Sequence, residues 1–134
     1  MATRRQVREA VVSLLYSYDL GNEDIAKSAD MIFEDKKIRN AQKDYGKELL
    51  DGVMSELDAI DVVVKDALND RELSDIGSIE KAVLRLGAYE ITKNLADRAV
   101  VINEAVEISK LLGAENSAKF VNGVLDAINK EPVK

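Results

Sequence analysis

One stretch of the 134-residue chain decides the fold: residues 79–93, which read IEKAVLRLGAYEITK. Its apolar residues cover nearly the whole circumference of a helical wheel. A helix that is apolar on all sides is usually buried in the centre of a helical protein. We therefore expect this segment to be a central helix that other helices surround.

On both sides of this segment, apolar residues recur at steps of three and four, which indicates amphipathic helices. These predicted helices span residues 7–18, 25–33, 41–68, 101–112 and 117–128. The third is one long helix or two helices broken around Ser55-Glu56. No stretch alternates apolar and polar residues long enough to predict a strand. The pattern predicts an all-α protein with about seven helices in short-loop bundles.

Several residues mark the ends of these helices. Thr3 and Gln6 have the spacing of a capping box. Gly21-Asn22 is expected to end the first helix and cap the second, and Gly113 is expected to end the helix over residues 101–112. Pro132 ends the ordered chain in this interpretation.

Three residues are unusual for the interior of a helix, because Asn and Gly disfavour that position. They are Asn103, Asn122 and Gly123. We expect a close contact between helices at Gly123 and side-chain hydrogen bonds from the two asparagines.

The composition excludes most enzyme classes. There is no Cys and no His, so the chain has no thiol nucleophile, no thiolate metal site and no imidazole base. No glycine-rich phosphate loop and no metal-loop spacing of carboxylates occurs. We predict that the protein is not an enzyme and holds no cofactor or metal, and we interpret four carboxylates as surface charges: Glu80, Glu90, Glu104 and Glu107.

Charge and hydropathy limit the place of action and the partners. The net charge of -6 means that nucleic acid can be bound only through a local basic patch. No apolar run suits a signal peptide or a membrane span, so we expect a cytoplasmic protein without membrane contact.

The strongest basic cluster consists of Arg4, Arg5 and Arg8, which the helical pattern places outward at the start of the first helix, where they could bind phosphates. An ordinary solvated helix end explains the cluster about as well. A second basic group, residues 36–47, is interleaved with acidic residues and is interpreted as a solvated face. Tyr16 lies off the apolar stripe of the first helix, either as an exposed anchor for a partner or partly covered.

Four ordered blocks of the sequence resemble the NusB family of transcription antitermination factors. They are residues 4–16, residues 79–90, residues 102–110 and residues 113–126. The resemblance implies an all-α fold of two packed helical bundles, the first over about residues 3–57 and the second over about residues 58–130, within a single domain over residues 1–134.

The resemblance also implies a function. Family members bind boxA RNA together with NusE, a small-subunit ribosomal protein, and join an antitermination complex on RNA polymerase, notably in rRNA operons. By position, the resemblance implies RNA contacts for Arg4, Arg5, Arg8, Asn116, Lys119 and Phe120. It implies NusE contacts for Tyr16 and Glu80.

The chain departs from the family pattern in three places. Its N-terminal arm is short and carries only three arginines, which suggests a weaker phosphate grip and more dependence on the partner. Residues 94–98 lack the proline that the family often has there, and residues 22–69 match only in helical pattern. Two alternatives remain open: an accessory NusB-like domain that acts with an rRNA methyltransferase, and a purely structural helical adaptor. A homodimer is possible.

Overall fold

The computed structural model describes residues 2–69, 71–113 and 116–128, and over these residues it contains helices and no strand. Seven α-helices and one short 3-10 helix follow one another: α1 (Arg4–Asp19), α2 (Ile25–Asp35), α3 (Ala41–Ser55), α4 (Leu57–Ala67), η1 (Leu73–Asp75), α5 (Ser78–Thr92), α6 (Arg98–Leu112) and α7 (Ser117–Ala127). The prediction of an all-α fold with about seven helices is confirmed.

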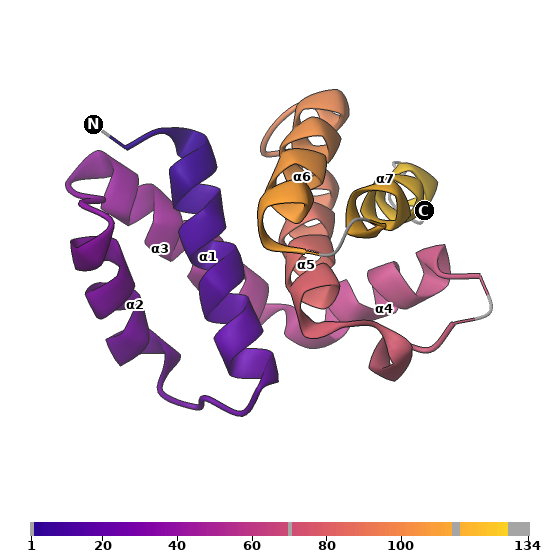
Figure 1. Cartoon of the computed structure of the whole chain (residues 1–134), viewed down its shortest axis with the longest axis horizontal. Coiled ribbons are helices and arrows are strands. Elements are labelled where there is room, and N and C mark those ends of the chain that lie inside the picture. The colour runs from indigo at the N-terminus through magenta and orange to yellow at the C-terminus, as the bar shows by residue number, and fades with distance from the viewer. Residues whose placement is uncertain (1, 70, 114–115, 129–134) are drawn as a thin grey trace.

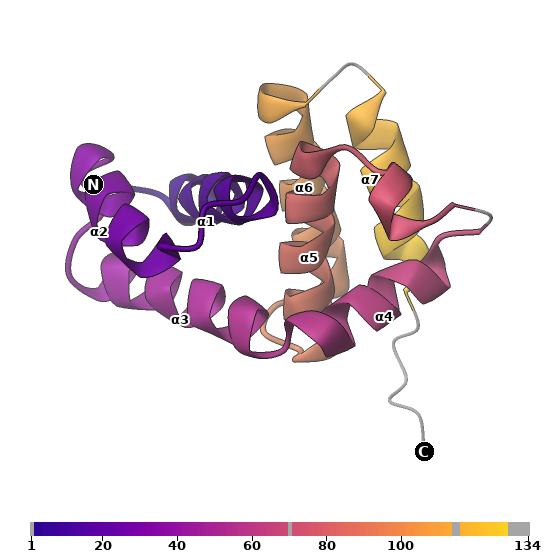
Figure 2. The same cartoon turned by 90° about the horizontal axis from the view of Figure 1, so that it is seen from below.

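The helices form two groups that meet along α1 and α5 (Figure 1). Helices α2 and α3 pack against α1, and α4, α6 and α7 pack against α5. In the view from below, α1 lies above α3 on one side of α5, and α4 continues from α3 beneath α5 and α7 (Figure 2). The predicted bundle boundary near residue 57 remains a prediction.

Helix α5 is central, as its sequence predicts. It contacts five helices, namely α1, α3, α4, α6 and α7. Eight of its residues are buried, and they include two charged ones, Arg85 and Glu90. Because a buried charge must be paired, these two side chains determine how α5 docks on its neighbours.

The long apolar segment over residues 41–68 is two helices. Helix α3 ends at Ser55, and Glu56 serves as the C-cap of α3 and the N-cap of α4. One buried apolar stripe, which includes Leu49, Val53, Ile60 and Val64, crosses this break. The chain therefore changes direction without interrupting the core. Because the apolar pattern continues across the break, it did not distinguish one long helix from two shorter ones.

Two of the predicted helix ends are confirmed. Thr3 and Gln6 form a complete capping box, and Gly113 is the C-cap of α6. Asn22 does not cap α2 through its side chain in the predicted way, because the N-cap is Asp24. Instead, Asn22 accepts a hydrogen bond from the Asp24 backbone and its amide donates to the hydroxyls of Ser17 and Ser28. Pro132 lies outside the described residues.

Within the described residues, each helix is too short or too polar to cross a membrane.

Candidate nucleic-acid and protein interfaces

The first turn of α1 presents Arg4 and Arg5 beside residues of α3 and α6. The capping box of Thr3 and Gln6 anchors this turn. The Arg4 guanidinium lies over the ring of Tyr45 on α3, with its Cζ 5.2 Å from the ring centroid. Arg5 donates from Nε to Glu104 Oε2 of α6 at 2.8 Å, and 42% of its side chain is exposed. We call Arg4 and Arg5 the arginine edge.

Arg8 does not belong to this exposed edge, so the prediction that all three arginines point outward is wrong for Arg8. Its side chain is 4% exposed and forms an ion pair with Glu90 of α5, whose side chain is 2% exposed. Arg8 Nε and Nη2 donate to the carboxylate at 3.0 to 3.2 Å. The Tyr45 hydroxyl donates to the same carboxylate at 3.4 Å.

Burial shapes the ionisation of this buried cluster. Burial lowers the pKa of Arg8, but the hydrogen bond and the negative charge of Glu90 outweigh that effect, so the pKa lies above its ordinary value and Arg8 stays charged. Burial and the charge of Glu90 together raise the pKa of Tyr45. The cluster joins α1, α3 and α5.

The interpretation of Glu90 as a surface charge is therefore wrong. Two sequence signals could have revealed the pair. Val12 and Leu15 follow Arg8 at helical spacing and are fully buried, so α1 buries a second face that includes Arg8. Glu90 is an acidic residue in a helix that is apolar on all sides, and such a residue usually has a buried cationic partner.

The start of α7 carries the second set of predicted RNA residues. Asn116, the N-cap of α7, and Lys119 are exposed, and Phe120 is partly buried. The guanidinium of Arg71 lies over the Phe120 ring, with its Cζ 5.0 Å from the ring centroid. Lys119 and Phe120 line an open groove between α7 and the end of α4, together with Arg71 and Asn69.

The expected reasons for the unusual helix residues are wrong. A Cβ on Gly123 would meet no atom within 4 Å, so α7 makes no close helix contact there. Asn103 and Asn122 are exposed, and their side chains form no hydrogen bond with the described residues.

Tyr16 and Glu80, the predicted partner residues, lie near the junction of α1 with the start of α5. Tyr16 is partly buried and packs against the core, which matches the alternative of a partly covered tyrosine. The carboxylate of Glu80 accepts a hydrogen bond from the Ser117 hydroxyl at the start of α7. Glu80 therefore connects the α5 start to α7.

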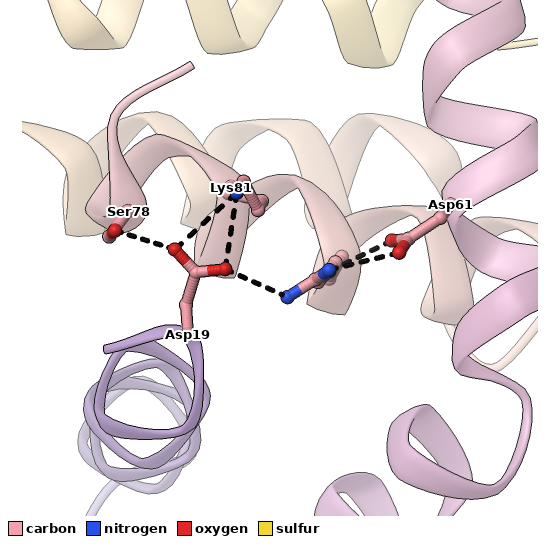
Figure 3. A network of polar contacts seen from close by, with 5 residues as sticks. Asp19, Asp61, Ser78 and Lys81 are labelled. Carbon is pink, nitrogen blue, oxygen red and sulfur yellow. Dashed lines mark hydrogen bonds and ion pairs between the residues drawn. The ribbon is translucent and has the colours of Figure 1, made fainter. Parts of the chain in front are cut away.

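A network of charged groups fixes the same junction (Figure 3). Asp19, the last residue of α1, accepts hydrogen bonds from Ser78 at 2.6 Å and from Lys81 at 3.1 Å. Arg85 lies 3.6 Å from Asp19 and donates to both oxygens of Asp61 on α4, at 2.8 and 2.9 Å. The network joins α1, α5 and α4, and no pattern in the sequence indicates it.

The structure brings some predicted site residues together and separates others. Glu80 lies in the first turn of α5 and contacts the α7 start, whereas Glu90 lies ten residues later and holds Arg8. At 1.5 Å of rise per residue, the two positions are about 15 Å apart along the helix. The α7 start is therefore close to the predicted partner residues, and the arginine edge lies nearer the other end of α5.

The family model for the NusB family matches residues 5–130 of this sequence. The chain belongs to the NusB family. A transcription antitermination protein NusB from Sulfurovum sp. strain NBC37-1 is 55% identical over 130 residues, which cover 97% of this chain and 100% of that relative. The function class of the chain is therefore transcription antitermination.

Solved NusB structures share the fold. NusB of T. maritima superposes with a TM-score of 0.84 at 32% identity, covering 97% of this chain and 92% of that chain. A crystal structure of the antitermination factors NusB and NusE in complex with dsRNA gives a TM-score of 0.84 at 29% identity, covering 92% of this chain and 93% of that chain. That NusB is thus seen with both a protein and an RNA.

Proposed function

We propose that this chain binds boxA RNA together with NusE and that the complex joins RNA polymerase to carry it past terminators, notably in rRNA operons. The NusB structure that contains NusE and dsRNA supports the RNA and the protein partner. The polymerase complex and the rRNA operons follow from the family function.

One observation carries the RNA part of the proposal: two arginines share the capped first turn of α1 in a protein of net charge -6. A protein with this overall charge is repelled by a phosphate backbone, so RNA must bind where cations are concentrated and ordered. Arg4 is exposed, and Arg5 is partly exposed. We assign phosphate contacts to these two residues, and we assign Arg8 the role of holding α1 on α5.

The start of α7 is the proposed second RNA surface. Lys119 offers a cation, Asn116 offers a side-chain amide, and Phe120 offers an aromatic ring beside the groove between α7 and α4. Side chains of these kinds bind unstacked bases and their phosphates. An RNA that touches this surface and the arginine edge has to extend along most of α5.

The proposed NusE surface comprises Tyr16 and Glu80. A partly buried tyrosine loses little freedom on binding and offers a large apolar area, which is typical of residues that dominate protein interfaces. Glu80 supplies a negative charge that would complement a basic ribosomal protein. A basic partner would also add positive surface next to the α7 start, beside Lys119 and Arg71.

The proposal makes the chain a binding protein in the cytoplasm rather than an enzyme. No cluster of His, Cys, Asp and Glu that could hold a metal occurs within the described residues. The close relationship to stand-alone NusB proteins favours antitermination over the two alternatives, an accessory domain for an rRNA methyltransferase and a structural adaptor.

The test is the binding of a fluorescent RNA containing boxA, measured by anisotropy with and without purified NusE. The RNA is used both as a single strand and as a duplex, because the solved complex contains dsRNA. We expect the Arg4→Ala/Arg5→Ala variant to bind boxA RNA more weakly. The slope of log affinity against log salt should decrease by up to about 1.4, the value for two full phosphate contacts to a single strand.

Two controls define the outcome. Lys36→Ala/Lys37→Ala removes the same charge from exposed positions after α2 and should leave RNA affinity nearly unchanged. Tyr16→Ala should weaken NusE binding by roughly tenfold or more and leave the binding of RNA alone unchanged. Equal affinity for a scrambled boxA sequence, or no loss in the double arginine variant, would contradict the RNA assignment.

A further inference from the structure

The two residues of the arginine edge differ in how their charge is compensated. Arg5 forms an ion pair with Glu104 at 2.8 Å. Arg4 has a tyrosine ring as its neighbour and forms no ion pair with the described residues. If both arginines bind phosphates, the Arg5 guanidinium does so while it is paired with the Glu104 carboxylate.

The geometry of the pair leaves part of Arg5 available. Both Nε and Nη2 approach the same oxygen of Glu104 at 2.8 Å. A guanidinium carries five N–H groups, so the contact to Glu104 leaves Nη1 without a partner in that pair. The Arg5 side chain is 42% exposed, whereas the Glu104 side chain is 16% exposed. Solvent, or a ligand in its place, therefore reaches the cation more easily than the anion.

The negative charge of Glu104 acts beyond Arg5. The charge of Glu104 contributes to raising the pKa of Arg8, so its electrostatic field reaches beyond the contact with Arg5. Arg8 is already neutralised by Glu90 within the core. Of the three arginines, Arg4 is therefore the one whose charge is least compensated.

We propose that Glu104 is a positioning residue that also limits RNA affinity: it holds the Arg5 guanidinium in place and cancels much of its attraction for an RNA phosphate. This inference rests on the proposed RNA function of the arginine edge. A phosphate at Arg5 experiences the guanidinium and, behind it, the carboxylate. The chain alone then binds RNA weakly and gains affinity from a partner that adds positive charge.

The experiment replaces Glu104 by Gln in the complex with NusE and measures boxA RNA affinity by anisotropy between 50 and 200 mM salt. Glutamine keeps the size and one acceptor oxygen but removes the charge. We expect about threefold tighter binding, the effect of one charge roughly 7 Å from a phosphate in a water-like medium, and a steeper salt dependence. A merely structural role for Glu104 would not steepen the salt dependence.

A matched control and a double variant make the assignment specific. Glu107→Gln removes the same charge one turn later on α6, where Glu107 lies 3.9 Å from Lys110, and should change affinity much less. The gain from Glu104→Gln should disappear in the Arg5→Ala background. A gain that persists without Arg5, or a Glu104→Gln protein with wild-type affinity and salt slope, would overturn the proposal.

A second comparison needs no change at Glu104. In the otherwise unchanged chain, Arg4→Ala removes one cation, whereas Arg5→Ala removes one cation and also leaves the Glu104 carboxylate unpaired beside the RNA. Arg5→Ala should therefore cost at least as much RNA affinity as Arg4→Ala. A clearly smaller loss for Arg5→Ala than for Arg4→Ala would count against the proposal. If the unsubstituted complex failed to bind boxA RNA, the proposed function itself would be wrong. If that complex bound RNA normally and Glu104→Gln left the affinity unchanged, only the inference about Glu104 would be wrong.

Discussion

At the scale of single residues, the buried carboxylate of Glu90 depends strongly on its hydrogen-bond and ion-pair partners. It lies on the central helix, is 2% exposed and receives hydrogen bonds from Arg8 and Tyr45. A buried ion pair adds little net stability compared with an apolar pair of similar size, but loss of one partner leaves the other charge buried and uncompensated. The pair therefore fixes how α1 sits on α5 more than it increases stability.

We predict that Glu90→Ala lowers the free energy of unfolding by about 3 to 5 kcal/mol, because Arg8 is left charged within the core. Urea unfolding followed by circular dichroism measures this loss. The double substitution Arg8→Met/Glu90→Leu should recover most of it, since both charges are removed.

The control for this prediction is Glu107→Ala, which removes a partly exposed carboxylate of α6. Such a surface substitution should stay within about 0.5 kcal/mol of the parent. If Glu90→Ala lowered the free energy of unfolding no more than the control does, the Arg8 guanidinium would be solvated in the variant. The buried pair would then not be what holds α1 on α5.

At the scale of helices, the side chain of Tyr89 on α5 packs directly against Gly52 on α3. A Cβ added to Gly52 would clash with the hydroxyl end of the Tyr89 ring. Glycine at this position therefore leaves room for the Tyr89 ring between the two helices. Gly123 on α7 is different, because its surroundings are open and its backbone is helical.

These two glycines predict opposite effects of the same substitution. Gly52→Ala should destabilise the protein by about 1 to 3 kcal/mol, because the Tyr89 ring and α3 have to move apart. Gly123→Ala should stabilise it by about 0.5 to 1 kcal/mol, because alanine favours the helix and nothing obstructs its methyl group. Thermal unfolding of the two variants beside the parent measures both signs, and stabilisation by Gly52→Ala would contradict the observed packing.

The helices could be predicted from the sequence because each one repeats its apolar residues over several turns. The central position of α5 followed from the same pattern. The pairs Arg8–Glu90 and Asp19–Lys81 could not be predicted, since their members are 82 and 62 positions apart in the chain and meet only when the helices dock. The openness around Gly123 was missed because sequence alone does not say which face of α7 is covered.

At the scale of the whole molecule, the network around Asp19 connects three helices from both groups (Figure 3). Burial raises the pKa of Asp19, but hydrogen bonds from Ser78 and Lys81 and the charges of Lys81 and Arg85 outweigh it and hold the pKa below its ordinary value. The folded protein therefore binds the Asp19 proton more weakly than the unfolded chain does. The resulting stability is present above the pKa of the unfolded chain and is lost as the pH falls through the lower pKa of the folded state.

We predict that Asp19→Asn reduces the free energy of unfolding at pH 7 and that this reduction shrinks as the pH falls below about 4. Urea unfolding at several pH values gives the difference between variant and parent. Asp30→Asn is the control: its two lysine partners also lower the pKa of Asp30, but the carboxyl is exposed to solvent and its interactions are screened by salt. A difference for Asp19→Asn that does not depend on pH would contradict this account of the network.

The capping box of Thr3 and Gln6 has a consequence for association that differs from its effect on helix stability. An uncapped first turn would fray, and a ligand that bound it would first have to order the backbone, at an entropic cost of about 1 to 2 kcal/mol per residue. Here the cap orders the turn that carries Arg4 and Arg5 before any ligand arrives. The loss of entropy occurs on folding instead of on binding, so the threonine hydroxyl of the cap helps to preorganise the two cations for the RNA contact that we propose.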